Sequence, residues 1–236
     1  PGVYYKKEMD TFGKEIYSAQ LIPNRGAWIE LETDANGVVS VRIDRNRKMP
    51  VTYLTRALGF SSNEEIMELF NNDIHIEETL KKDETQNTKE ALIAIYKKLR
   101  PGEPATEESG TTLLRNFFYD PRRYDLAKVG RYKLNKKLSW ENRLKGHRTE
   151  GPIVDTETGE IIIQGNALID EEAIAILKKS GVFSKAEMVE VMTQKEDGTP
   201  VKVICSNGMR DDGYRILDRA DIIAAVDYLL NMIQGY

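Results

Sequence analysis

Residues 28–43 read WIELETDANGVVSVRI, and this stretch decides the fold class. Apolar and polar residues alternate on both sides of residues 34–37, which is the pattern of two strands that each bury one face. The sequence Asp34-Ala35-Asn36-Gly37 between them has the composition of a tight turn. The stretch therefore predicts an antiparallel hairpin. Its second strand places Arg42 and Asp44 on a charged face opposite the valines.

A further strand is predicted before this hairpin. Residues 16–22 are mostly apolar and end at Pro23, and the turn-forming residues Asn24-Arg25-Gly26 follow. Trp28 then stands where the chain enters the hairpin. The first segment therefore indicates an antiparallel unit with one solvated, charged face.

Helices are predicted in the middle of the chain. Ser61 and Glu64 have the spacing of a capping box ahead of an apolar run. Pro101 and Gly102 are expected to end the helix predicted at 92–99. Proline disfavours helical backbone at the residue before it, and glycine permits non-helical backbone conformations. Thr106 is suited to begin the next helix. The expected helical ranges are 51–58, 61–70, 92–99 and 106–118.

The last third of the chain mixes strands and helices. Residues 153–163 predict a second hairpin, because the turn-forming stretch 155–159 interrupts two apolar runs. Helices are expected to begin at Asp170 and Asp218, with a short strand at 201–204 between them. The whole pattern predicts an α+β fold of mixed antiparallel strands and helices. The span from about residue 151 to 212 is interpreted as an inserted or appended module.

Composition excludes several classes of protein. The chain has 236 residues, a net charge of -4 and 40% hydrophobic residues, so it is long and apolar enough to bury a core. No apolar run is long enough to cross a membrane. The single cysteine, Cys205, is expected to be a small buried side chain and suits a reducing cytoplasm.

Motifs for catalysis and metal binding are missing from the sequence. No glycine-rich phosphate loop is present, and His75 and His147 are expected at the surface. Asp211 and Asp212 lack a third carboxylate at a useful spacing, so a surface turn is expected there. We predict no catalytic residue, no metal site and no cofactor in this chain.

The near-neutral total charge hides two basic clusters. Residues 115–148 contain eleven Lys or Arg and three acidic residues. Residues 42–56 contain five Lys or Arg and one acidic residue. Clusters of this kind attract polyanions, and phosphate backbones are a common target. An ordinary solvated surface has the same composition, so both interpretations stay open.

Several residues in or near these clusters are candidates for binding nucleic acid. Trp28 follows a turn and offers a flat ring for base stacking, although a core tryptophan is an equal alternative. Arg100 stands at a Pro/Gly corner and is suited to contact a phosphate or, alternatively, to stabilise a helix end. Either Arg122 or Arg123 is expected to pair with Asp125 and so position the loop.

The segment at residues 128–137 mixes aromatic residues with cations, which is compatible with nucleic-acid binding. Arg131 and Lys133 are the candidates within it.

Three groups of sequence strings resemble one family. They are PGVYY at residues 1–5; IPNRGAW at 22–28 with VRIDRNRKMPVT at 41–52; and LRPGEP at 99–104 with RYDLAKVGRYKLN at 123–135. In order and spacing they resemble the β subunit of bacterial DNA-dependent RNA polymerase. The likeness covers residues 1–145 closely, and the last helix also fits.

The resemblance implies a structural part and a domain division. The part is the lobe of β, which forms one wall of the channel that holds downstream DNA. Residues 1–150 plus 213–236 are then the conserved lobe, and 151–212 are a variable insertion to which no function is assigned. The sequence strings that flank the lobe in the family are absent, so the resemblance implies a piece of a longer polypeptide that does not polymerise by itself.

The resemblance also implies site residues and partners. The tryptophan of the family stacks on a base of the non-template strand, and the arginine of the RPGEP string faces the same DNA. The implied DNA-binding set is Trp28, Arg100, Arg122, Arg123, Arg131 and Lys133. The implied partners are DNA and the β′, α and sigma subunits, with catalytic Mg²⁺ held by β′ and the whole enzyme in the cytoplasm. The alternative is a protein-docking module for sigma, β′ or a regulator.

Overall fold

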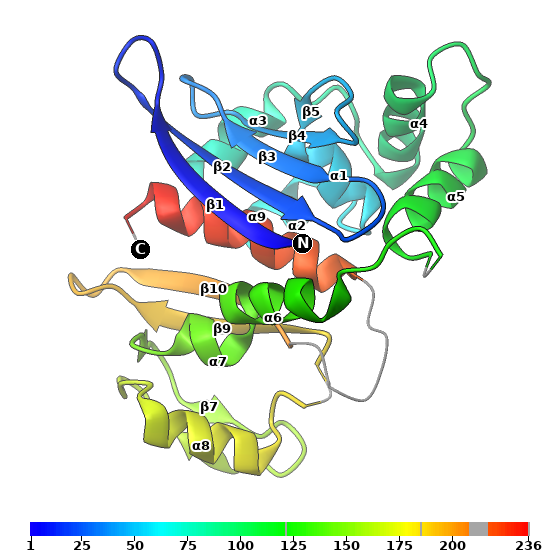
Figure 1. Ribbon diagram of the computed structural model, residues 1–236. Helices are drawn as coiled ribbons and strands as arrows, with labels where there is room; N and C mark the ends of the chain where they lie inside the picture. The colour runs from blue at the N-terminus through cyan, green and yellow to red at the C-terminus, as the bar shows by residue number, and fades with distance from the viewer. Residues whose placement is uncertain (121, 185, 208–216, 236) are drawn as a thin grey trace.

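An antiparallel sheet forms the first part of the computed structural model, which describes residues 1–120, 122–184, 186–207 and 217–235. Each strand of this sheet pairs with the next one along the chain (Figure 1). The predicted hairpin and the strand before it are confirmed, whereas β1 was not predicted because its second half is charged and exposed. The strands are β1 (Gly2–Met9), β2 (Glu15–Ile22), β3 (Ile29–Thr33), β4 (Val39–Ile43) and β5 (Met49–Pro50).

The alternation of apolar and polar residues along the hairpin places them on opposite faces of the sheet. Ile29 in β3 and Val41 in β4 are fully buried on the face that meets the helices. Arg42 lies on the opposite face, directly across from Glu30 in the register of the two strands. The sheet therefore has one apolar face and one charged face, as the period of two predicts.

Helices cover the apolar face and extend beyond it. Helix α9 (Arg219–Ile233) lies between the five-stranded sheet and strand β10 (Pro200–Ser206) (Figure 1) and contacts both β2 and β10. Helices α4 and α5 pack against each other, and α4 also packs against α1. The helices are α1 (Val51–Ala57), α2 (Asn63–Leu69), α3 (Ile74–Leu80), α4 (Thr88–Leu99), α5 (Glu107–Phe118), α6 (Ala127–Leu138), α7 (Trp140–Leu144), α8 (Glu171–Ser180) and α9 (Arg219–Ile233).

The caps of these helices follow the sequence closely, with one shift. Thr106, Asp170 and Asp218 are N-caps, as predicted. The capping box of α2 is formed by Ser62 and Glu65 rather than by Ser61 and Glu64. The shift arises because Ser62 is the last extended residue, and the Glu65 carboxylate accepts both its N–H and the N–H of the residue before it.

A second hydrophobic core is separate from the first. It contains the three-stranded sheet of β6 (Arg148–Thr149), β9 (Met188–Gln194) and β10 (Pro200–Ser206). The predicted hairpin at 153–163 is confirmed as β7 (Ile153–Val154) and β8 (Ile161–Ile163). Within this core Trp140 packs against Phe183, with ring centroids 5.2 Å apart.

Strand β10 belongs to both cores. Val203 and Cys205 are buried in the second core, and Ile204 between them is buried in the first. Cys205 is therefore a small buried side chain, as expected, and burial raises the pKa of its thiol to about 12. The α+β class is confirmed. The division of the chain after residues 150 and 212 stays a prediction, and Asp211 and Asp212 lie outside the described residues.

Two arginines of the basic clusters are buried structural residues and not surface cations. Arg56 donates from Nε to Asp83 at 3.1 Å, and this pair is almost completely buried. Arg143 donates from Nη2 to Asp227 at 2.9 Å, with both side chains at most 6% exposed. Counting charges in the sequence therefore overestimated the number of cations at the surface. Whether an arginine is buried depends on partners that lie far away along the chain.

Candidate nucleic-acid interface

Two loops that are distant in sequence meet at one end of the sheet. The loop of residues 23–28 connects β2 to β3, and the segment at 122–126 leads into α6. The backbone N–H of Asn24 donates to the carbonyl of Asp125 at 2.6 Å, and the N–H of Asp125 donates to the carbonyl of Arg25 at 3.3 Å. These bonds bring Trp28 and Arg123 to the same end of the molecule.

Gly26 permits this close approach. Its φ of 121° lies in the region that favours glycine, and a Cβ atom there would stand 2.5 Å from the carbonyl oxygen of Arg123. A side chain at this position would therefore push the two loops apart.

We expect Gly26→Ala to lower the free energy of unfolding by about 1–3 kcal/mol, because it adds both backbone strain and a steric clash. Gly13→Ala is the matched control, since Gly13 has a φ of 76° and a Cβ atom added there would meet no other atom within 4 Å. Urea denaturation of both variants measures the difference. Equal losses in the two variants would show that the loops do not depend on this contact.

Trp28 is half-buried and stands at the start of β3. Its carbonyl accepts the N–H of Asp44 at 3.0 Å, and the guanidinium of Arg45 lies 5.5 Å from the centroid of the indole ring. Asp44 and Arg45 both have positive φ, at 52° and 62°, which fixes a tight turn between β4 and β5. The indole is thus neither a core residue nor freely exposed.

Exposed arginines surround this end of the sheet. Arg25, Arg45, Arg47 and Arg123 make no ion pair with any residue that the structure describes. Arg122 is 89% exposed and pairs with Asp120, Nε to Oδ1 at 3.2 Å. We call Arg25, Arg45, Arg47, Arg122 and Arg123 the arginine cluster.

The expected pairing of Arg122 or Arg123 with Asp125 was wrong. The Asp125 carboxylate instead accepts the backbone N–H of Ala127 at 2.8 Å, at the start of α6. Asp120 takes the role of positioning the loop, because it accepts both the backbone N–H and the guanidinium of Arg122. These hydrogen bonds hold the pKa of Asp120 below its usual range.

The two candidates on α6 differ from the cluster in exposure. Lys133 is half-buried, and its ammonium donates to the Tyr4 hydroxyl at 2.5 Å and lies 4.6 Å from the centre of that ring. Its stem covers Gly2, where a Cβ atom would come within 2.7 Å. Lys133 therefore holds β1 against α6. Arg131 is also half-buried, on the same helix.

Arg100 lies apart from the other candidates. It is the exposed C-cap of α4, and its N–H donates to the Tyr96 carbonyl at 2.8 Å. The connection that follows it forms the outer end of the α4–α5 pair, which projects away from the sheet (Figure 1). Among the described residues, none of its hydrogen bonds or ion pairs joins Arg100 to the loop that carries Trp28.

A family model described as RNA polymerase Rpb2, domain 2, matches residues 1–150 of this chain. The chain belongs to this family. The resemblance to the bacterial polymerase β subunit is confirmed by relatives over most of the chain. A DNA-directed RNA polymerase subunit beta from Alkaliphilus oremlandii (strain OhILAs) is 53% identical over 204 residues, or 86% of this chain and 16% of that protein.

The subunit of the same name from Staphylococcus aureus (strain JH9) is 43% identical over 252 aligned residues, which cover 100% of this chain and 21% of that protein. This Rpb2 domain 2 chain thus matches only about a sixth to a fifth of the length of these relatives.

Sequence reasoning missed three members of the arginine cluster in this Rpb2 domain 2 chain. Arg25 was interpreted only as a turn residue, and Arg45 and Arg47 only as charges in a basic run. The pairing of Arg25 with Asp125 and the left-handed turn at Arg45 place both beside Trp28. A cation between turn-forming residues was the signal that could have identified Arg25.

Other polar candidates have structural roles or lie elsewhere. His75 is half-buried, with Nδ1 3.0 Å from the Gly37 carbonyl oxygen, and His147 is half-buried in a separate pocket. Both histidines were expected at the surface, and both are only partly exposed. No group of three or more potential metal ligands occurs in the described ranges. Within the same ranges, no helix has the length and apolar character of a membrane span.

Proposed function

We propose that this chain is the lobe of the β subunit in a bacterial DNA-dependent RNA polymerase and that it forms part of the wall of the downstream DNA channel. It binds DNA and assembles with the β′, α and sigma subunits in the cytoplasm. The nucleotidyl transfer belongs to the whole enzyme, whose Mg²⁺ is held by β′, and this chain supplies no catalytic group. Membership of the Rpb2 domain 2 family supports this assignment.

The arrangement around Trp28 is the observation that carries the DNA contact. A half-exposed indole offers a π surface on which a base of any identity can stack. The exposed arginines around it are suited to phosphate, because a guanidinium donates two parallel hydrogen bonds to adjacent oxygens. Arg122 and Arg123 stand on one loop, and Arg25 on the loop bonded to it. We propose that a promoter non-template base stacks on Trp28 while neighbouring phosphates contact the arginine cluster.

The other candidates contribute less directly. Arg131 and Lys133 add positive potential along α6, although the ammonium of Lys133 is already engaged by Tyr4. Arg100 reaches DNA only where a duplex also passes the outer end of the α4–α5 pair. Affinity of the isolated chain is expected to be micromolar or weaker and to fall with salt, because only a few phosphates are neutralised.

Trp28→Ala is expected to weaken binding of a single-stranded oligonucleotide by about 1–3 kcal/mol, or roughly 5- to 150-fold, through loss of stacking. Trp28→Phe should retain most of the affinity, since it keeps an aromatic ring. Phe12→Ala is the matched control, because Phe12 is 88% exposed on the β1–β2 turn, at the other end of β2. Fluorescence anisotropy at two salt concentrations measures all four proteins.

The same substitutions in the assembled polymerase test the contact in place. We expect Trp28→Ala to alter complexes at the start site and to leave subunit assembly intact. Equal DNA affinity of Trp28→Ala and Phe12→Ala, in proteins of equal stability, would refute the stacking role.

A protein-docking function is the second candidate, and a specific observation favours it. Val129 and Tyr132 on α6 are 57% and 66% exposed, beside the cations of the same helix. An exposed aromatic and aliphatic pair with a basic rim is typical of a surface that meets another protein. Loss of assembly in Trp28→Ala, with unchanged DNA affinity of the isolated chain, would support this function over the first.

A further inference from the structure

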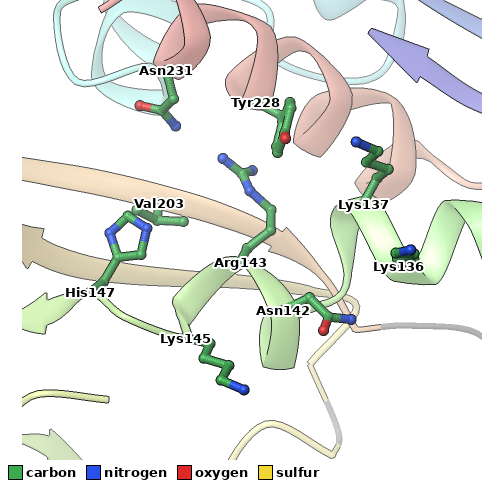
Figure 2. A pocket seen from close by; sticks show the side chains of 9 residues that line it. All are labelled: Lys136, Lys137, Asn142, Arg143, Lys145, His147, Val203, Tyr228 and Asn231. Atoms are coloured by element: carbon green, nitrogen blue, oxygen red, sulfur yellow. The ribbon is translucent and has the colours of Figure 1, made fainter. Parts of the chain in front are cut away.

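A basic pocket lies between the two cores, at the far end of α6 from the arginine cluster. It has a volume of about 240 Å³ and is walled by the end of α6, by α7, by β10 and by α9. Figure 2 shows its lining side chains, with Arg143 in the middle and His147 and Lys137 on either side. The lining residues are Lys136, Lys137, Asn142, Arg143, Lys145, His147, Val203, Tyr228 and Asn231.

The charges around this pocket do not balance. None of the nine lining residues is acidic. Arg143 is neutralised by Asp227 behind it, and Lys145 pairs with Glu171 at 2.6 Å. Lys136 and Lys137 make no ion pair with any described residue, although the ammonium of Lys137 lies 6.0 Å from the rings of Tyr5 and Tyr228. Lys136 and Lys137, which are neighbours in sequence, therefore bring to the pocket lining two ammonium groups that have no acidic partner among the described residues.

The pKa of His147 depends on the electrostatic environment of the pocket. Burial and then the charge of Arg143 lower the pKa of His147 to about 4. The other titratable groups of the pocket walls are Lys136 and Lys137 from α6, Lys145 after α7, and Tyr228 and Asp227 from α9. At neutral pH the imidazole is therefore uncharged, and an anion in the pocket would oppose the effect of Arg143.

We propose that this pocket binds a phosphomonoester dianion, held at its rim by Lys136 and Lys137. A phosphomonoester carries a charge of about -1.5 to -2 at pH 7, which matches the two uncompensated ammonium groups. A carboxylate or a phosphodiester carries a single negative charge and leaves one ammonium unmatched. Lysine binds phosphate as a point charge with three rotatable donors, so two lysines can reach different oxygens of one tetrahedral group. The source of the group is inorganic phosphate or the terminal phosphate of a nucleotide.

The test titrates the 236-residue chain with inorganic phosphate, adenosine 5′-monophosphate, acetate and a dinucleotide that has one phosphodiester and no terminal phosphate. Ionic strength is held constant with sodium chloride, so that general screening is equal in all arms. The NMR signal of the His147 ring is followed at pH 7, where a phosphomonoester is mostly a dianion. We expect inorganic phosphate, the nucleotide or both to shift this signal saturably, and acetate and the phosphodiester to shift it much less at the same concentration.

The variant Lys136→Gln/Lys137→Gln should weaken phosphate binding by about tenfold or more, because two charge-assisted contacts are lost. The matched control is Lys97→Gln/Lys98→Gln, since these lysines also lie in the last turn of a helix, and Lys98 lies 5.9 Å from the Tyr53 ring. The control should bind as the unmodified chain does. Binding of the nucleotide but not of inorganic phosphate would support the proposal and identify the nucleotide as the source, and the reverse would identify free phosphate.

Three results would overturn the proposal. They are equal binding of acetate and phosphate, tighter binding of the phosphodiester than of any monoester, and unchanged phosphate affinity in Lys136→Gln/Lys137→Gln. An absence of binding in every arm would overturn it as well.

Discussion

Replacement of Arg143 by methionine is expected to lower the free energy of unfolding by about 3–5 kcal/mol, because it leaves a buried carboxylate without its counter-charge. Arg143 donates to Asp227 and also to the carbonyl oxygens of Ile204 and Ala224. One side chain on α7 thus satisfies acceptors on β10 and on α9. Its loss weakens the junction between the two hydrophobic cores.

The pH dependence of this variant follows from Asp227. Burial raises the pKa of Asp227, and Arg143 acts in the opposite direction. Without Arg143 the pKa rises further, so the folded state binds a proton more strongly than the unfolded state does. The stability deficit of Arg143→Met relative to the unmodified chain therefore grows as the pH rises from the pKa of Asp227 in that chain to its higher pKa in the variant. Urea denaturation at pH 5 and pH 8 should show the larger deficit at pH 8.

Two controls separate the buried charge from other effects of the substitution. Arg143→Met/Asp227→Asn should lose less stability than Arg143→Met, since the amide oxygen still accepts the Ile204 N–H without a charge. Arg219→Met removes an exposed pair with Glu187 and should cost less than about 1 kcal/mol. A loss in Arg143→Met as small as that of Arg219→Met would contradict the structural role.

The second large effect is expected at Arg56, where methionine should also cost about 3–5 kcal/mol. Arg56 is 1% exposed and Asp83 is completely buried in their ion pair. The same guanidinium donates to the carbonyl oxygen of Ser61 and to the side-chain oxygen of Asn63. The residue therefore ties α1 to the start of α2 and to the segment before α4.

Thermal and urea unfolding of Arg56→Met measure this effect, and Lys81→Met is the control. Lys81 pairs with Glu78 at 2.6 Å on the surface of α3, with its side chain 56% exposed, so its loss should cost less than about 1 kcal/mol. Similar unfolding midpoints for the two variants would show that the buried pair contributes little beyond a surface pair.

Local signals in the sequence were sufficient for most secondary structure. The alternation in residues 28–43 required a hairpin, and the capping residues Thr106, Asp170 and Asp218 began helices where they were expected. Helix α6 was not predicted, because its cations hide a weak apolar stripe. Its buried residues Leu134 and Leu138 recur at helical spacing but stand among lysines.

The candidate site could be predicted only in part from the sequence. Trp28, Arg122 and Arg123 are brought to one end of the sheet, but Arg25 and Arg45 join them only through loop pairing and a left-handed turn. The role of each residue in DNA binding stays a proposal. Arg100 was predicted on the same surface, and no hydrogen bond or ion pair among the described residues connects it to this group.

The amino-acid sequence by itself determined the α+β class, the hairpins, the helix starts and membership of the polymerase family, because all of these depend on residues close together in the chain or on whole strings of them. Only the tertiary structure decided which arginines are buried and which face solvent. Arg56 and Arg45 stand in the same basic run. Arg56 is buried in an ion pair with Asp83, whereas Arg45 lies over the Trp28 ring. The cost of burying a charge depends on the partners that the fold brings to it, and those partners lie far away in sequence.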